Sequence, residues 1–255
     1  MTALITGASS GLGWEFAKLF AKDGCDLILV ARRTDKLNEL KSELEKSYGI
    51  AVTVLSQDLT AKNAAKTVYD FTVKNKFAVD FLVNNAGFGD YGAFIGCNLE
   101  KQQNMIQLNV AALTELSYYF LPQMVERKAG RILNVASIAS FMPGPMMSVY
   151  YSTKAYVRSF SEALSVEVKK AGVSVTALCP GPTTSEFWER SEADGSSIFK
   201  HMFFAKAENV ARYGYKRMKR GKALAVPGIM TRLEVFFMRF LPRSFVRNVI
   251  YFVQK

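Results

Sequence analysis

Short apolar runs alternate with amphipathic stretches along the chain. Each run holds five or six mostly apolar residues, which is typical of strands buried on both faces of a sheet. The runs are Thr2–Thr6, Leu27–Ala31, Ala51–Leu55, Val79–Val83, Arg131–Val135 and Val173–Leu178. Segments whose apolar residues have helical spacing lie between these runs, for example Leu12–Lys22, Asp35–Lys46 and Val149–Lys169. The alternation predicts an α/β fold with a doubly wound parallel sheet covered by helices.

Length and composition favour one domain. The chain has 255 residues, of which 49% are hydrophobic, enough for one substantial core. No linker, internal repeat or low-complexity tract divides it, so we expect a single Rossmann-type domain over residues 1–255. It opens on a strand rather than on a signal peptide, and no uncharged apolar stretch reaches the roughly eighteen residues of a membrane span.

Cysteine and histidine usage narrows the class of site. Cys25, Cys97 and Cys179 are widely spaced and odd in number, and His201 is the single histidine. The pattern predicts neither a disulfide framework nor a metal-ligand cluster. Together with the missing signal peptide, it favours a reducing, cytoplasmic setting.

Residues with candidate chemistry follow five of the predicted strands. They are Gly7, Arg32, Asp58, the pair Asn84–Asn85, and Ser137. In open α/β sheets, ligands bind beyond the carboxyl ends of the strands. A single such residue could be accidental, but five at one edge predict one continuous cleft.

The first of these positions opens a glycine-rich loop, Gly7–Gly13, between a strand and a helix. Glycines permit the tight turn and let the backbone approach a pyrophosphate, whose charge the helix N-terminus attracts. A plain strand-to-helix turn is the alternative, but the strand–turn–helix setting favours a dinucleotide site. Its expected binding residues are Gly7, Ser9, Ser10, Gly11, Leu12 and Gly13.

Four motifs in order resemble the classical short-chain dehydrogenase/reductase family. Thr6–Gly13 (TGASSGLG) is similar to the family's cofactor loop, and Asn84–Gly87 (NNAG) to its motif after the fourth strand. Ser137 with Tyr150-x-x-x-Lys154 is similar to the catalytic set, and Pro180-Gly181 to the motif after the sixth strand. The resemblance covers residues 2 to about 190. It implies an oxidoreductase that interconverts a carbonyl and a secondary alcohol.

Arg32 and Arg33 predict the cofactor. An acid at the end of the second strand would bind the ribose 2′-hydroxyl of NAD, whereas arginine accommodates the 2′-phosphate of NADP. Arg32 and Arg33 stand there with no acid before them, so we expect NADP(H). Two solvated arginines on a loop are the alternative.

The resemblance also implies the remaining cofactor contacts. Asp58 and its neighbour Leu59 are expected at the adenine, and Asn85, Ala86 and Gly87 at the adenosine ribose. Pro180, Gly181 and Thr183 are expected to pass the nicotinamide carboxamide. Family members often have Val where Thr183 stands, so its side-chain contact is less secure than its backbone contact.

Tyr150 and Lys154 carry the predicted proton transfer. Four residues apart on a helix, they share one face. Free tyrosine has a pKa of about 10, and a nearby ammonium would lower it. Tyr150 would donate a proton to the developing alkoxide, Ser137 would polarise the carbonyl, and Lys154 would hold the nicotinamide ribose. The resemblance implies that Asn109 holds a water linking Lys154 to a proton relay.

Each of these assignments has an alternative. Tyr151 adjoins Tyr150, but only Tyr150 is four residues before Lys154. Ser140 competes with Ser137, whose interval to Tyr150 matches the family. Asn109 could simply bend a helix.

Residues 184–210 are expected, by family analogy, to form a lid over the substrate. Aromatic residues and methionines around them suggest a roomy apolar pocket, although ordinary packing is an equal alternative for the methionines. These residues are Phe141, Met142, Met146, Met147, Phe187, Trp188 and Phe203. They favour a bulky, hydrophobic carbonyl compound over a small polar sugar.

The tail, residues 228–255, departs from a minimal member of the family. Residues 201–255 hold 12 of the 33 Lys and Arg but 2 of the 22 Asp and Glu, so most of the net charge of +11 lies there. Arg232, Arg239, Arg243 and Arg247 would form one basic stripe on an amphipathic helix that Pro242 breaks or kinks. The tail could pack in an interface or over the cleft, lie peripherally on an anionic membrane, or bind an anionic substrate handle. Nucleic acid is not expected, because no recognition motif accompanies the charge.

Three functions fit these residues. A carbonyl reductase or alcohol dehydrogenase is preferred, and a membrane-associated 3-oxoacyl reductase is supported by the tail. A non-catalytic cofactor-sensing protein on the same fold is disfavoured by the intact catalytic set. A sugar-nucleotide epimerase would need a longer chain. The resemblance implies homodimers or homotetramers built on the long helices around Asn109 and Tyr150.

Overall fold

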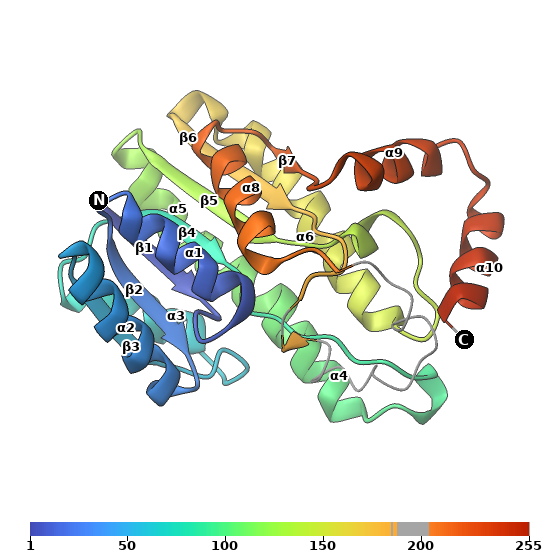
Figure 1. Cartoon of the computed structure of the whole chain (residues 1–255), viewed down its shortest axis with the longest axis horizontal. Coiled ribbons are helices and arrows are strands. Elements are labelled where there is room, and N and C mark those ends of the chain that lie inside the picture. The colour runs from blue at the N-terminus through green and yellow to red at the C-terminus, as the bar shows by residue number, and fades with distance from the viewer. Residues whose placement is uncertain (185, 188–203, 255) are drawn as a thin grey trace.

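The predicted sheet is present in the computed structural model, which describes residues 1–184, 186–187 and 204–254 (Figure 1). Within them, seven strands pair in parallel in the order β3-β2-β1-β4-β5-β6-β7. The strands are β1 Thr2–Thr6, β2 Asp26–Ala31, β3 Val52–Ser56, β4 Val79–Asn84, β5 Gly130–Val135, β6 Val173–Leu178 and β7 Leu224–Ala225. The six predicted runs are confirmed to within a residue at each end. β7 is too short to produce a sequence pattern.

Helices cover both faces of this sheet. α1, α2 and α8 pack on one face, and α3, α5 and α6 on the other. The helices are α1 Gly11–Lys22, α2 Thr34–Tyr48, α3 Ala64–Lys74, α4 Leu99–Ile106, α5 Leu113–Glu126, α6 Ser148–Glu167, α8 Ala207–Lys219, α9 Ile229–Met238 and α10 Arg243–Gln254. A π-helical segment, Gln107–Ala112, joins α4 to α5.

The strands are apolar on both sides because both sides are buried. Side chains alternate between the faces of a strand, so Ile5 and Leu29 join the core beneath α1 and α2, whereas Leu4 and Ile28 join the core beneath α3 and α5. All four are at most 1% exposed. Burial of each such side chain contributes roughly 1.5–3 kcal/mol.

The strand order positions the cleft. The chain runs outward from β1 through β2 to β3 and then returns to β4, on the other side of β1. Helices therefore leave β1 and β4 toward opposite faces, and a crevice opens at the carboxyl ends of these strands. The glycine loop follows β1, and residues 85–87 follow β4.

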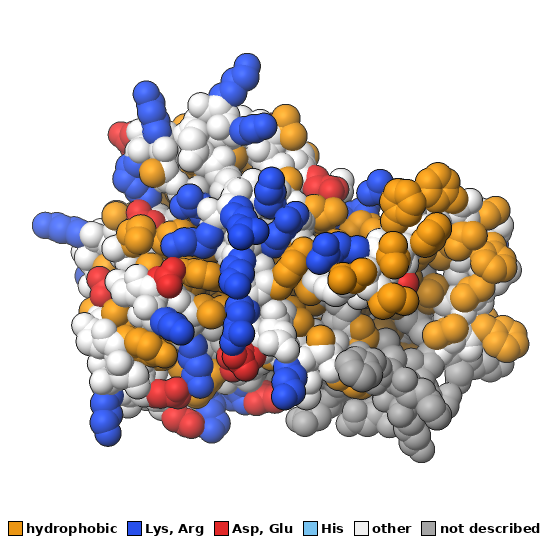
Figure 2. Space-filling view, turned by 45° about the horizontal axis from the view of Figure 1, so that its top comes forward, with side chains coloured by type: hydrophobic (Ala, Val, Ile, Leu, Met, Phe, Trp, Pro, Cys, Tyr) orange, Lys and Arg blue, Asp and Glu red, His pale blue; other side chains and the backbone are white. Residues whose placement is uncertain are grey.

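Residues 229–254, here called the arm, extend from the body of the molecule (Figure 1). α9 ends at Met238 and α10 begins at Arg243, with Pro242 between them. Hydrophobic side chains gather over the arm at the right of Figure 2. Among the described residues, no helix combines the length and apolarity that a membrane crossing requires.

Candidate active site

The glycine loop after β1 leaves no room for larger side chains at two positions. Gly7 has a φ of +65°, and a Cβ there would lie 2.9 Å from Ala86 Cα. A Cβ on Gly13 would lie 2.3 Å from the carbonyl oxygen of Gly7. Ser10 precedes α1, and its side chain does not cap the helix. The backbone N–H groups of the first turn are therefore available to bind an anion. The loop thus has the tight turn and the donors of a phosphate-binding site.

Asn85 fixes this loop to the end of β4. Its side-chain nitrogen donates to the carbonyl oxygens of Thr6 at 3.0 Å and Gly7 at 3.2 Å. The Thr6 hydroxyl accepts from the backbone N–H groups of Asn85 and Ala86, both at 3.0 Å. The two motifs that follow β1 and β4 therefore form one hydrogen-bonded unit.

The two arginines after β2 have different surroundings. The Arg32 side chain is 64% exposed, and its ion pair with Asp58 is long, at 3.8 Å. Arg33 donates through Nε to the Ser9 hydroxyl at 3.3 Å and forms an ion pair with Glu186 at 2.9 Å. Arg33 thus braces the glycine loop, whereas Arg32 projects into solvent beside the cleft.

Asp58 is held as a carboxylate. Burial alone would raise its pKa, but hydrogen bonds from the Thr60 amide and hydroxyl, together with the charge of Arg32, outweigh burial and lower the pKa. The Thr60 bonds are 2.9 Å and 2.8 Å long. Both donors lie two residues away along the chain, so a local turn fixes this side chain.

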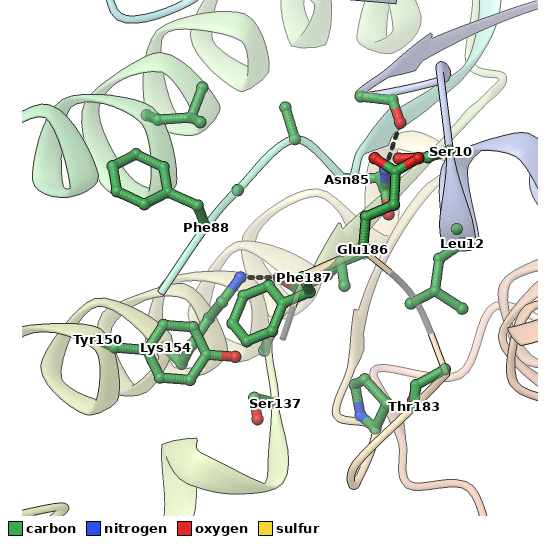
Figure 3. A pocket seen from close by; sticks show the side chains of 18 of the residues that line it. Ser10, Leu12, Asn85, Phe88, Ser137, Tyr150, Lys154, Thr183, Glu186 and Phe187 are labelled. Atoms are coloured by element: carbon green, nitrogen blue, oxygen red, sulfur yellow. Dashed lines mark hydrogen bonds between the residues drawn. The ribbon is translucent and has the colours of Figure 1, made fainter. Parts of the chain in front are cut away.

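Ser137, Tyr150 and Lys154 gather at the other end of the cleft (Figure 3). Ser137 follows β5 and begins the 3-10 helix Ile138–Phe141. Tyr150 and Lys154 lie one turn apart on α6, with the Lys154 Nζ 5.8 Å from the centre of the Tyr150 ring. Lys154 donates to the carbonyl oxygen of Val135 at 2.8 Å. The end of β5 thereby positions both Ser137 and the lysine.

The two competing residues have other contacts. The Ser140 hydroxyl donates to Cys179 Sγ at 3.8 Å and is not part of the cleft wall. Tyr151 does line the cleft, but its hydroxyl accepts from Gln254 Nε2 at 2.6 Å. Ser137 and Tyr150 therefore remain the hydroxyl groups assigned to the catalytic end of the cleft, and both line it.

Burial dominates the ionisation of the catalytic candidates. It raises the pKa of Tyr150 well above its usual value, and the Ser137 hydroxyl opposes this rise. It lowers the pKa of Lys154 to about 8. In the protein alone, desolvation of the buried phenol therefore outweighs any stabilisation of the phenolate by the lysine, and the expected lowering by Lys154 stays a prediction.

Asn109 lies in the π-helical segment and is fully buried. Its Oδ1 accepts from the backbone N–H of Phe88 at 3.1 Å, while its Nδ2 donates to Phe88 O at 2.9 Å and to Thr153 Oγ1 at 3.2 Å. The side chain therefore clamps the segment after β4 to α6. Its role toward a water stays a prediction.

One cavity of about 520 Å³ joins the two ends. Of the predicted site residues, Gly13 and Asn109 lie behind its wall. The others line it: Gly7, Ser9, Ser10, Gly11, Leu12, Arg32, Arg33, Asp58, Leu59, Asn85, Ala86, Gly87, Ser137, Tyr150, Lys154, Pro180, Gly181 and Thr183. Five strand ends thus contribute to one cleft, as the sequence predicted.

The catalytic end of the cleft is apolar. Phe88, Met147, Tyr151 and Phe187 surround Tyr150, and the Phe187 ring centre lies 5.3 Å from that of Tyr150. Two of the expected pocket residues, Met147 and Phe187, therefore line the cleft. Phe141, Met142 and Met146 do not, and the Phe141 ring instead packs under the guanidinium of Arg158 at 4.3 Å.

The expected lid is described only at its two ends. Residue 185 and residues 188–203, including Trp188 and Phe203, lie outside the described residues. Thr183 pairs with Ala205 in an isolated bridge. From Ala207 the chain is already α8, and Val210 packs into the core, so the last residues of the expected lid belong to the body.

Two contacts of this site could not be found by sequence reasoning. Glu186 reaches Arg33 across 153 residues, and Gln254 reaches Tyr151 across 103 residues. Neither belongs to a motif, and pairings this distant leave no local pattern.

Comparison with known proteins agrees with this geometry. The family model described as short chain dehydrogenase matches residues 1–195. A short-chain dehydrogenase from Sphingobium yanoikuyae, solved in complex with NADPH, is 32% identical, with a TM-score of 0.84 over 94% of this chain and 93% of that one. The bulky-bulky ketone specific alcohol dehydrogenase from Comamonas testosteroni is 26% identical, with a TM-score of 0.79 over 95% of each chain.

A curated relative is matched over a shorter stretch. The very-long-chain 3-oxoacyl-CoA reductase of Laccaria bicolor is 37% identical over 180 residues, which are 69% of this chain and 53% of that protein. The chain thus spans about half the length of this relative. The family match over residues 1–195 includes the glycine loop and the catalytic residues, and the chain belongs to the short-chain dehydrogenase family of oxidoreductases.

Proposed function

We propose that this protein is an NADP(H)-dependent oxidoreductase that interconverts a carbonyl and a secondary alcohol on a bulky hydrophobic substrate. The observation that carries the proposal is the single cleft, with helix-terminal amides and arginines at one end and Ser137, Tyr150 and Lys154 at the other. The nicotinamide dinucleotide, when bound, supplies or accepts the hydride.

The residues of this chain fit such a cofactor. The glycine loop offers backbone donors at the start of α1, and a positively charged side chain lies beside the adenosine end. NADP(H) is preferred because Arg32 is exposed and its pair with Asp58 is long, so its guanidinium can turn to a 2′-phosphate. Arg33 is given a supporting role, because Ser9 and Glu186 already engage its guanidinium.

In reduction, Ser137 donates a hydrogen bond to the carbonyl oxygen and polarises it. As hydride reaches the carbon, Tyr150 gives its proton to the same oxygen, and a neutral alcohol leaves. Lys154 holds the nicotinamide ribose hydroxyls and supplies positive charge beside the phenol. Asn109 keeps α6 and the segment after β4 in register, so that Lys154 and the cofactor share one geometry.

The substrate class rests on the lining around Tyr150. Phe88, Met147, Tyr151 and Phe187 offer apolar surface, and the structural relative from Comamonas testosteroni is specific for bulky ketones by its name. Removal of large apolar groups from water in such a pocket favours substrates with extended rings or chains.

The test is oxidation of NADPH, with NADH in parallel, across small ketones, keto-steroids and 3-oxoacyl thioesters. We expect turnover with NADPH on at least one of the bulky groups and a weaker rate on small ketones. Tight NADPH binding with no turnover on any group would instead favour the cofactor-sensing alternative.

We also propose a homo-oligomer assembled through α5 and α6. Tyr118 on α5 and Tyr156 and Val166 on α6 are exposed large apolar residues. Light scattering should give a mass of at least twice the 28.4 kDa of the chain. A monomer at micromolar concentration would overturn this assignment.

A further inference from the structure

The arm exposes most of its large apolar side chains. On α9 and the turn after it, these are Ile229, Met230, Leu233, Phe236, Phe237, Phe240 and Leu241; on α10 they are Phe245, Val249, Tyr251, Phe252 and Val253. Phe252 is 88% exposed, whereas Phe16 and Phe20 on α1 are fully buried. Figure 2 shows this concentration of hydrophobic side chains over α9 and α10.

These residues form faces rather than scattered positions. On α9 they recur at spacings of three and four from residue 229, which places them on one side of the helix. Val235, on the other side, is buried against Ala136 and Val226. On α10, Phe245, Val249 and Phe252 share a face, while Val246 and Gln254 are buried. A few residues of the arm are thus buried against the body, while most of its large apolar side chains are exposed.

Positive charge accompanies this face. Arg232, Arg239, Arg243 and Arg247 are all exposed, and Glu234 is the single acid between residues 228 and 254. By helical position, Arg232 and Arg239 lie along one edge of the apolar face of α9, between it and the buried side. Arg232 also stacks over the ring of Tyr213 at 5.6 Å. α9 is thus an amphipathic surface with a basic border, whereas Arg243 and Arg247 lie on the side of α10 opposite Phe245, Val249 and Phe252.

We propose that the arm is a peripheral docking surface for an anionic lipid bilayer. Apolar and aromatic side chains of an amphipathic helix enter the boundary between headgroups and acyl chains, while arginines meet anionic headgroups. Burial of so many exposed phenylalanines supplies the apolar contribution, and the basic border is complementary to phosphate. A second copy of the arm is a poorer partner, because it would oppose arginines to arginines with one glutamate on each side.

The arm also contacts the catalytic end of the cleft. Gln254 Nε2 donates to Tyr151, and the Gln254 carbonyl oxygen accepts from the Tyr91 hydroxyl. Tyr151 lines the cleft next to Tyr150. The docking surface and the apolar end of the cleft are thus joined by α10. If the proposed function holds, this placement implies that the substrate is a ketone or alcohol dissolved in the lipid layer.

Vesicle flotation of the full chain tests the docking surface without requiring turnover. We expect binding to phosphatidylcholine vesicles containing phosphatidylglycerol, weakened at least roughly tenfold on vesicles of phosphatidylcholine alone. The double variant F237E/F240E should lose binding at least roughly tenfold, and R232E/R239E should lose it in a salt-dependent manner. Tyr48→Glu and Lys46→Glu on α2, which are exposed and distant from the arm in sequence, are matched controls and should bind as the parent does.

The outcomes separate the alternatives. Unchanged binding by F237E/F240E, or no flotation with either vesicle at physiological salt, would overturn the proposal. So would a concentration-dependent dimer in light scattering that F237E/F240E abolishes while vesicles have no effect, since that would identify a second copy as the occupant. NADPH binding by each arm variant should equal that of the parent, which establishes that the variants are folded. Flotation without ketone turnover would leave the docking surface standing and reject the proposed reaction.

Discussion

The strand–loop–helix unit at the start of the chain and the arm at its other end are both rich in apolar residues, yet they place them oppositely. In β1 and α1, Ile5, Phe16 and Phe20 are fully buried between sheet and helices. In the arm, Phe237 and Phe240 are more than half exposed. The difference lies in partners: β1 is a central strand with a neighbour on each side, whereas the arm follows β7 at the edge of the sheet. Apolar content therefore predicts burial only where a second element is available to cover it.

The comparison predicts that changes in the catalytic centre have far larger effects on turnover than changes in the arm. The largest should come from Tyr150→Phe, which removes the proton that the alkoxide accepts. General acid catalysis is worth about 10²–10⁴ in rate, so we expect kcat for ketone reduction to fall by about 10³-fold while NADPH still binds. Stopped-flow and steady-state rates with NADPH would measure it. Tyr151→Phe is the matched control and should retain activity within a few-fold; equal loss in both variants would contradict the assignment.

Gly13→Ala tests the close backbone packing of the unit at the start of the chain. The new Cβ would meet Gly7 O at 2.3 Å and Asn85 Nδ2 at 2.7 Å. Overpacking of this kind costs roughly 1–3 kcal/mol, and the shifted loop should bind NADPH at least tenfold more weakly. Thermal unfolding and a fluorescence titration measure the two effects. Gly96→Ala, where a Cβ would meet nothing within 4 Å, should behave as the parent.

Arg32→Asp tests which arginine selects the cofactor. A hydrogen bond to a charged group is worth about 1.5–3 kcal/mol, so the preference for NADPH over NADH should fall by roughly 10- to 100-fold. The ratio of kcat/KM values for the two cofactors measures it. Arg33→Ala should instead weaken both cofactors, because Arg33 braces Ser9 and Glu186. An unchanged ratio in Arg32→Asp would place the 2′-phosphate elsewhere.

The pH dependence of ketone reduction should report the ionisation of Lys154. Burial lowers its pKa to about 8, so the ammonium is present below pH 8 and is lost above it. Tyr150 stays protonated through this range because its pKa is raised. We therefore expect kcat/KM for the ketone to be level below pH 8 and to fall by up to about tenfold per unit above it. A profile that stays level to pH 10, with NADPH affinity unchanged, would show that the charge of Lys154 does not assist proton donation by Tyr150.

Gln254→Ala should have the smallest effect and should depend on substrate size. Tyr151 loses the hydrogen bond that opposes the burial-raised pKa of its hydroxyl, and its ring loses a fixed position beside the cleft. We expect KM for a bulky ketone to rise about threefold to tenfold at nearly constant kcat, with little change for a small ketone. Asn248→Ala, on an exposed face of α10, is the matched control. An equal rise in KM for both ketones would show that Gln254 only stabilises the fold and does not position Tyr151 for the bulky substrate.

Most of the cleft could be predicted because its determinants are local. The glycine loop and Tyr150-x-x-x-Lys154 each form within one turn or one strand end, and five such ends converge once the sheet is parallel. The ion pair from Arg33 to Glu186 and the bond from Gln254 to Tyr151 could not, since nothing in the chain near either residue specifies a partner so distant. The net direction of the Tyr150 pKa in the protein alone could not be predicted for a related reason: the burial of the tyrosine depends on the packing of the whole cleft.

The π-helical segment between α4 and α5 imposes a constraint of length. An α-helix advances about 100° per residue, and a π-turn accommodates one residue more than an α-turn. Deletion of one residue from Gln107–Ala112 would therefore restore a regular helix and rotate Asn109 away from Phe88 and Thr153. At this junction the number of residues, and not only their identity, therefore determines where Asn109 points.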